Sequence, residues 1–549
     1  MRTHGVSESP ELTRILGIKL RKLVIEKDRV LRDGVALPDL TPLFRKPGGT
    51  LNIWPLQNAA LHEIYEANGG LILLGVGFGK TFISLAAAEV MDSKRCVLLV
   101  KPQLKNQLLT RDLPFYSKHF NLPLDRIHVV SYNELSSADK ADILNRLQPD
   151  LIVADECHSL RHRTSARTRR FLRFMKNHPG TRFVGLSGTI AKRSVKDYPH
   201  LSDLALGKNS PLPQNFRILD EWAEALDSGD NPRPAGALEK LCEPGEDVRS
   251  GYRRRLIETP GVVASEEGAI GTSLIISVRP LEMPDNVKTE LAKLYATWQI
   301  GEEELTDAMA LSRVARQIIS GMYYIWKWPE GKRDGEWIDA RRAWHRSIRE
   351  YIQHTSKDGM DSPLLLARAA MAGRWHCPDW APWDAVRDRP EPETLPVWIS
   401  DFMVADAIKW GKEHMKTNGL IFYEHDAIGQ MISRFGGFPL YGAGMDASDT
   451  DPDRDPVIVC SSRAQGEGKN LQRWSNMLLT AVPANGLAFE QIMGRCHRPG
   501  QMADEVCVDL YLHCDEFKRA FDTALRDAEF IESTQGQKQK LLFATKVLE

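Results

Sequence analysis

Apolar runs that read as buried strands alternate with helix-like segments in one part of this chain of 549 residues. The first run, "GGLILLGV" at 69–76, precedes the helix-like "KTFISLAAAEVM", and "CVLLVK", "IHVVSY", "PDLIVADE" and "RFVGLSG" follow it. Strands that alternate with helices predict a parallel sheet covered by helices on both faces. We therefore expect an α/β domain over about residues 45–205.

The same alternation resumes near the other end of the chain, in "GLIFYEH", "PVIVCSS", "NMLLTAV" and "EVCVDLYL", and predicts a second parallel-sheet domain over 396–515. Prolines and glycines interrupt residues 206–395, where amphipathic segments predict a mostly helical, tryptophan-rich insertion. Leucines at helical spacing predict a helix over 11–33 in an N-terminal helical segment, 1–44. Residues 516–549 are expected to form a helical tail.

The net charge of −1 gives the protein no global field that would attract a polyanion, so any contact with nucleic acid must come from local patches. Two are visible, "RHRTSARTRRFLR" at 161–173 and "YRRRL" at 252–256, and each is equally compatible with a solvated arginine face. The eight cysteines include no CxxC pair, which argues against a zinc ribbon. Neither a secretory signal nor a membrane span is visible, so we expect a cytoplasmic protein.

The segment "LLGVGFGKTF", residues 73–82, resembles a phosphate-binding loop, although Leu74 stands where the strict pattern has glycine. Glycines let backbone N–H groups approach a phosphate, and the start of the following helix favours an anion. Lys80 could then reach the outer phosphates, and Thr81 could bind magnesium. By itself, the loop could also be a glycine-rich turn.

Two adjacent carboxylates end the strand-like run "PDLIVADECH", residues 149–158. Asp155 could hold magnesium through its water shell, and Glu156 could polarise an attacking water molecule. Alone, the pair could be a surface turn. Because the carboxyl ends of parallel strands face one crevice, however, the acids and the phosphate loop together predict a nucleotide-binding site.

Five segments occur in the order of the motor motifs of superfamily two helicases: "GVGFGKT", "DECH", "LSGT", "QGEGKNLQ" and "QIMGRCHRPGQ". The last segment is most similar to the Swi/Snf-like branch, and "WPLQ" at 54–57 resembles the adenine-reading Q motif. The resemblance implies two RecA-like motor domains with the helical insertion between them, with ATP and Mg²⁺ as cofactors. The compact length resembles phage or prokaryotic members, for which the location would be the bacterial cytoplasm.

The resemblance also implies a role for each matching residue. In the first domain Gln57 would read adenine, Asp155 would hold the metal and Glu156 would be the catalytic carboxylate. The nucleotide phosphates and magnesium would be held by Gly75, Gly77, Phe78, Gly79, Lys80 and Thr81. Coupling to the nucleic acid would fall to His158, Ser187, Gly188 and Thr189. In the second domain the residues implied to close over ATP are Gly468, Asn470, Gln491 and the arginine fingers Arg495 and Arg498.

The predicted function is that of a DNA-dependent ATPase, a helicase or translocase on double-stranded or branched DNA, in replication, recombination or repair. Contacts would be mainly to the DNA backbone, and other replication or repair proteins are possible partners. Two alternatives stay open, an RNA helicase and an ATP-driven remodeller of protein–nucleic acid complexes. The branch usually has Thr-Gly-Thr-Pro where this chain has "SGTI", and it has apolar residues at Glu467 and Lys469, which argues against chromatin-type remodelling.

Overall fold

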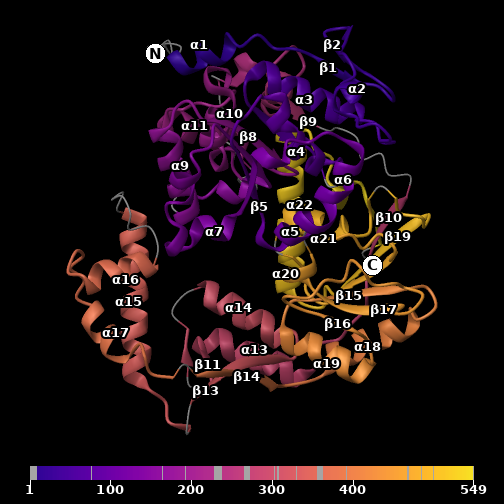
Figure 1. Cartoon of the computed structure of the whole chain (residues 1–549). Helices are drawn as coiled ribbons and strands as arrows, with labels where there is room; N and C mark the ends of the chain where they lie inside the picture. The colour runs from indigo at the N-terminus through magenta and orange to yellow at the C-terminus, as the bar shows by residue number, and fades with distance from the viewer. Residues whose placement is uncertain are drawn as a thin grey trace, which may run out of the picture. The chain divides into compact units, whose positions relative to one another are not determined.

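The chain, seen in a computed structural model, divides into two compact units, each assembled from separate stretches of sequence (Figure 1). The first unit comprises Met1–Gly268, Tyr351–Ala369 and Asp527–Gln539, and the second Ala269–Glu350, Ala370–Arg526 and Lys540–Glu549. The structure describes residues 9–547 except 76, 164, 192, 228–235, 237, 265–271, 302, 306–307, 329–330, 355–362, 391, 467–468, 484 and 499.

Six parallel strands form the sheet of the first unit, in the order β6-β5-β7-β8-β4-β9. They are β4 (Gly70–Leu73), β5 (Cys96–Val100), β6 (Ile127–Ser131), β7 (Leu151–Asp155), β8 (Arg182–Ser187) and β9 (Val262–Ala264). Successive residues face two different cores: Leu71 and Leu73 belong to one apolar cluster, and Ile72 belongs to the other. The alternation shows that both faces of the sheet are covered, as the apolar runs predict.

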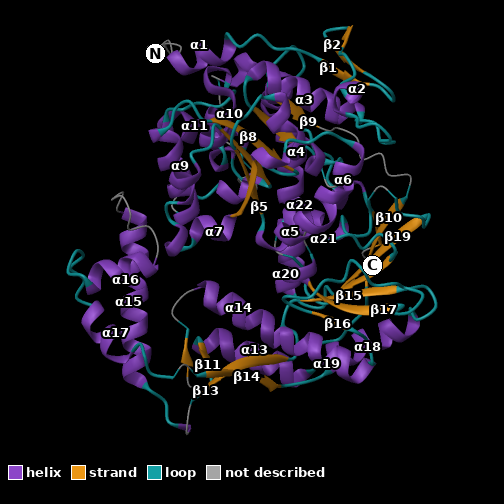
Figure 2. Cartoon of the chain, in the orientation of Figure 1, coloured by secondary structure: helices purple, strands orange, loops and turns teal. Residues whose placement is uncertain are grey.

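Helices cover both faces of this sheet (Figure 2). One core includes residues of α9 (Ala166–Asn177) and α10 (Pro199–Leu206), and the other includes residues of α3 (Pro55–Ala67) and α4 (Lys80–Val90). The same unit also contains α5 (Pro102–Gln107), α6 (Leu113–His119), α7 (Tyr132–Ser136), α8 (Ile143–Leu147), α11 (Phe216–Leu226) and α12 (Val248–Glu258).

The predicted N-terminal helix over 11–33 is wrong. Helix α1 (Pro10–Leu16) stops at Gly17, and an antiparallel sheet of β1 (Leu23–Ile25), β2 (Val30–Arg32) and β3 (Val35–Ala36) follows, before the short α2 (Thr41–Phe44). Asp33 and Gly34 both have positive φ, 49° and 82°, as a two-residue hairpin turn requires. The Asp-Gly pair was the overlooked signal.

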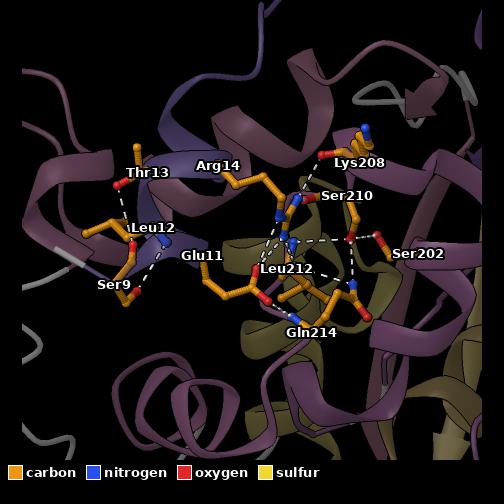
Figure 3. A network of polar contacts seen from close by, with 10 residues as sticks. All are labelled: Ser9, Glu11, Leu12, Thr13, Arg14, Ser202, Lys208, Ser210, Leu212 and Gln214. Atoms are coloured by element: carbon orange, nitrogen blue, oxygen red, sulfur yellow. Dashed lines mark hydrogen bonds and ion pairs between the residues drawn. The ribbon is translucent and has the colours of Figure 1, made fainter.

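Arg14 fastens α1 to the loop that follows α10 (Figure 3). Its guanidinium donates to the backbone oxygens of Lys208, Ser210 and Leu212 at 2.7–2.8 Å. The neighbouring Glu11 accepts from the backbone N–H of Gln214 at 3.1 Å and pairs with Arg14 at 2.9 Å. The N-terminal helix is therefore an integral part of the first unit.

Seven parallel strands form the sheet of the second unit, in the order β16-β17-β15-β18-β19-β10-β20. They are β10 (Ser273–Val278), β15 (Gly419–Tyr423), β16 (Leu440–Tyr441), β17 (Val457–Ser461), β18 (Asn476–Leu479), β19 (Glu505–Leu510) and β20 (Thr545–Val547). The helices are α13 (Asp285–Thr297), α14 (Ala308–Ile319), α18 (Phe402–Glu413), α19 (Asp426–Gly436), α20 (Ser462–Gln465), α21 (Gly486–Met493) and α23 (Lys540–Phe543). Helix α22 (Asp515–Gln535) begins in this unit and ends in the first.

Two parallel α/β sheets flanked by helices confirm the predicted RecA-like fold class. The boundaries of the second sheet differ from the predicted 396–515, because β10 and β20 lie outside that range and pair side by side. The predicted boundaries place the run "SLIISV" of β10 in the insertion and β20 in the helical tail, so both placements are wrong. Among the described residues, no helix is long and apolar enough to cross a membrane.

Tryptophans pack on one another in the insertion, where β13 (Met322–Lys327) pairs antiparallel with β14 (Glu393–Trp398). Between these strands lie α15 (Gly335–His354), α16 (Pro363–Met371) and α17 (Trp380–Val386), and the short β11 (Gln299–Ile300) and β12 (Glu303–Glu304) precede them. Trp337 is buried, with the rings of Trp326, Trp328 and Trp383 at 5.8–6.1 Å. These rings form a small core, in keeping with the amphipathic helices around them.

Candidate nucleotide-binding site

The predicted phosphate loop lies between the buried strand β4 and the start of α4 at Lys80. Gly77 and Gly79 have φ of 95° and 72°, a left-handed backbone that side chains other than glycine rarely adopt. Phe78 is half-buried, and its ring would lie 3.4 Å from a Cβ added at Gly75. Glycine at positions 77 and 79 thus allows the positive φ angles of this turn, as in phosphate-binding loops.

Lys80 reaches back across the loop. Its Nζ donates to the backbone oxygens of Leu74 at 2.8 Å and Gly75 at 3.1 Å, and lies 3.6 Å from Glu156 Oε1. Thr81, the next residue, is half-buried in the first turn of α4. The structure therefore brings the loop lysine and the predicted catalytic carboxylate together, although 75 residues lie between them in the sequence.

Gln57 joins the start of α3 to the same loop. Its Oε1 accepts from the backbone N–H of Trp54 at 2.9 Å, and its Nε2 donates to the Gly79 oxygen at 3.4 Å. A Cβ on Gly79 would lie 2.0 Å from this Nε2. The position beside the loop suits a residue that reads the nucleotide, and its contact with adenine stays a prediction.

The acid pair stands where β7 ends. Glu156 has φ 54° and ψ 51°, again left-handed, and its Oε2 lies 3.2 Å from His158 Nδ1. The same Nδ1 lies 3.0 Å from the hydroxyl of Ser187, which also donates to the Thr189 oxygen at 2.8 Å. These contacts link the acid pair to the turn after β8.

That turn also adjoins the phosphate loop. A Cβ on Gly188 would lie 3.4 Å from the Leu74 oxygen and 3.6 Å from Lys80 Nζ. Four segments predicted to act together, the Q motif, the loop, the acid pair and the Ser-Gly-Thr turn, thus meet at the carboxyl edge of one sheet.

The two acids have pKa values shifted in opposite directions, because their neighbours differ. Burial and the adjacent Glu156 carboxylate raise the pKa of Asp155 to about 6. Burial would also raise the pKa of Glu156, but the charge of Lys80 and the hydrogen bond to His158 hold it well below its ordinary value. Glu156 therefore loses its proton at a lower pH than Asp155 does.

The residues fit a magnesium ion. Asp155 Oδ1 is buried and accepts no hydrogen bond from the described residues. A hydrated cation would satisfy this oxygen and favour the ionised carboxylate. Asp155, together with the Thr81 hydroxyl, would hold the ion, which when bound neutralises phosphate charge.

Residues 50–192 match a family model described as type III restriction enzyme, res subunit (ResIII). This family is one of the superfamily two helicases, and the match spans the Q motif, the phosphate loop, the acid pair and the Ser-Gly-Thr turn. The matched stretch is thus a superfamily two helicase domain, which in general hydrolyses ATP with Mg²⁺ and binds nucleic acid. A comparison with curated proteins found no match. The Swi/Snf-like branch and the phage type stay predictions.

Two residues of the helicase domain were missed by sequence reasoning. Tyr132, directly after β6, donates its hydroxyl to the Asp155 backbone oxygen at 2.8 Å. Lys101, directly after β5, is buried, and its charge adds to that of Lys80 in lowering the pKa of Glu156. Both follow apolar runs, so the rule that sites gather at the carboxyl ends of parallel strands could have found them.

The residues predicted to act from the second sheet gather around α21. Arg495 is buried, and it donates to the backbone oxygens of Gln491 at 2.7 Å and Lys469 at 3.0 Å. Next to Lys469, Asn470 has a buried Oδ1 without a hydrogen-bond partner in the described part of the chain. Arg498 is half-buried, and Gly468 lies outside the described residues. The roles of these residues toward ATP stay predictions.

The arginine-rich segments make contacts within the first unit. Arg170 is buried and donates to the backbone oxygens of Leu135 at 2.7 Å and Ser137 at 2.6 Å. Arg254 pairs with Glu246 at 2.9 Å, and Arg255 donates to the Ile15 oxygen at 3.0 Å. Several of these arginines therefore hold the fold together, while Arg163 is exposed.

Proposed function

We propose that this protein is a DNA-dependent ATPase that acts as a helicase or translocase on double-stranded or branched DNA, in replication, recombination or repair. The observation that carries the proposal is the 3.6 Å approach of Lys80 Nζ to Glu156 Oε1 beside a glycine-rich loop. A phosphate-binding lysine and a catalytic acid so placed are the two halves of an ATP-hydrolysing site.

In the proposed reaction, the backbone N–H groups of the loop and the start of α4 hold the ATP phosphates. Lys80 exchanges its loop carbonyl partners and its approach to Glu156 for phosphate oxygens. Glu156, ionised at neutral pH, then orients and polarises the attacking water molecule, while Asp155 and Thr81 would hold the magnesium ion that accompanies ATP.

The Swi/Snf-like resemblance supports a further part of the proposal. Arg495 and Arg498 would neutralise the negative charge that develops during phosphoryl transfer, an effect worth about 10³–10⁵ in rate in other enzymes of this chemistry. Gln491, whose backbone oxygen accepts from Arg495, would help to orient the same group.

The decisive experiment compares ATP hydrolysis with duplex DNA, branched DNA, single-stranded DNA and RNA. We expect duplex or branched DNA to stimulate hydrolysis most. Stronger stimulation by RNA would identify an RNA helicase, and stimulation only with a protein partner present would identify a remodeller.

Two variants test the site itself. Lys80→Ala and Glu156→Gln should each abolish hydrolysis, because the first removes the phosphate-binding charge and the second the catalytic carboxylate. DNA binding, followed by fluorescence anisotropy, should survive in both. Normal turnover in either variant would refute the motor assignment.

A further inference from the structure

Tyr132 has a buried hydroxyl that no step of the proposed hydrolysis uses. The residue begins α7, directly after β6, and its side chain is 1% exposed. Its hydroxyl donates to the backbone oxygen of Asp155 at 2.8 Å. Because β5 lies between β6 and β7 in the sheet, the ring must extend past the end of a whole strand to reach this oxygen.

The oxygen that Tyr132 binds belongs to the peptide between the two predicted catalytic acids. Glu156, on the other side of that peptide, has the left-handed backbone that residues with a Cβ rarely adopt. Such a conformation persists only where the surrounding contacts enforce it. Ser159 donates its N–H to the Glu156 oxygen at 2.9 Å, the pairing of β7 with β8 extends to Asp155 beside Leu186, and Tyr132 adds a contact from outside the ladder.

The start of α7 is itself held firmly. Ser131 caps the helix: its hydroxyl accepts from the Glu134 N–H at 3.2 Å, and its own N–H donates to Glu134 Oε2 at 2.8 Å. Glu134 also binds Lys105 and Lys140, each at 2.6 Å. Tyr132 is thus a rigid support and is well placed to fix a neighbouring peptide.

We propose that Tyr132 is a positioning residue that holds the Asp155–Glu156 peptide in the orientation that hydrolysis requires. The inference rests on the proposed ATPase function. Without the hydroxyl, the Asp155 oxygen loses the hydrogen bond from Tyr132, and the peptide is held on the β8 side only, which lets Glu156 shift toward an ordinary backbone. Its carboxylate then moves away from Lys80 and His158, and from the water molecule that it polarises.

The test is Tyr132→Phe, which keeps the buried ring and removes only the hydroxyl. Because Glu156 acts on the attacking water while the loop binds ATP, kcat should fall about tenfold, the factor of about 1.4 kcal/mol of barrier, and KM for ATP should stay within about twofold. The matched control is Tyr198→Phe, since Tyr198 is equally buried in the same unit and its hydroxyl bonds only to that of Tyr252 among the described contacts. It should lower the melting temperature but leave kcat unchanged.

Lys80→Ala measured in parallel separates the two claims. If the wild type hydrolyses no more ATP than Lys80→Ala, the proposed function fails, and the role of Tyr132 fails with it. If the wild type is active and Tyr132→Phe keeps kcat within about twofold, the positioning role alone is overturned. The same holds if both tyrosine variants lower kcat equally, or if only KM changes.

Discussion

Replacing Gly79 by alanine tests the contact between the Q motif and the phosphate loop. With φ of 72°, an alanine at this position costs about 1 kcal/mol in backbone strain. Its Cβ would also stand 2.0 Å from Gln57 Nε2, so the Gln57 side chain must leave. Losing the hydrogen bond that Gln57 accepts from Trp54 adds about 1 kcal/mol, and the total is about 2 kcal/mol.

A double-mutant cycle separates the two costs. In a Gln57→Ala background the steric part vanishes, so Gly79→Ala should cost only about 1 kcal/mol, which leaves a coupling of about 1 kcal/mol between the positions. Gly34→Ala is the control for strain alone, because Gly34 has φ of 82° and nothing within 4 Å of an added Cβ. The measurement is the free energy of unfolding in urea, followed by circular dichroism. Equal costs of Gly79→Ala in both backgrounds would refute the reasoning.

Three further predictions concern the stability of the first unit. Gln535→Leu should cost about 2 kcal/mol in urea unfolding, because buried Gln535 bonds to both Ile190 and Ala191, each at 3.2 Å. Gln537→Leu, which removes a buried amide without hydrogen bonds among the described residues, should cost nothing, and equal losses would contradict the assignment. Burial lowers the pKa of His200 to about 4, so protons favour the unfolded chain, and stability should fall by about 3 kcal/mol as pH drops from 6.5 to 4. His200→Gln should flatten that pH profile, and an unchanged profile would count against it. Arg170→Met should cost about 2 kcal/mol and lower the melting temperature by several degrees. The exposed Arg163→Met, which loses only a cation–π contact with Phe216 at 5.8 Å, should lower it far less, and equal shifts would contradict a structural role for Arg170.

Local pattern was enough to predict the two sheets and the residues that meet at the carboxyl edge of the first one; their roles toward ATP stay predictions. Strands β4 and β7 are short apolar runs, and the glycine-rich loop and the acid pair follow them directly in the sequence. A few consecutive residues therefore predict both the strand and the polar groups at its carboxyl end. Leu74 broke the strict loop pattern, yet its backbone oxygen is a partner of Lys80. Any residue at position 74 could supply this backbone oxygen, so leucine in place of the glycine of the strict pattern does not prevent the contact with Lys80.

What could not be predicted depends on partners far away in the chain. The strand order that places β10 beside β20 has no local signature, because either run could pair with several others. Tyr132 was missed because its hydroxyl bonds to a backbone oxygen 23 positions away. A sequence pattern does not show which backbone oxygen a side chain reaches in the fold. The N-terminal hairpin is different, since Asp33-Gly34 was a legible turn signal that leucine periodicity overrode.

The first unit includes residues 527–539, which the ribosome synthesises last among its parts. Ile190 and Gln535 are 345 positions apart, so on the ribosome the turn after β8 emerges long before its partner exists. The turn after β8 therefore lacks its hydrogen bonds to Gln535 until nearly all of this sequence has been synthesised. Expression of residues 1–268 alone should therefore give a fragment that aggregates, and supplying a peptide of residues 515–540 in trans is the natural way to rescue it.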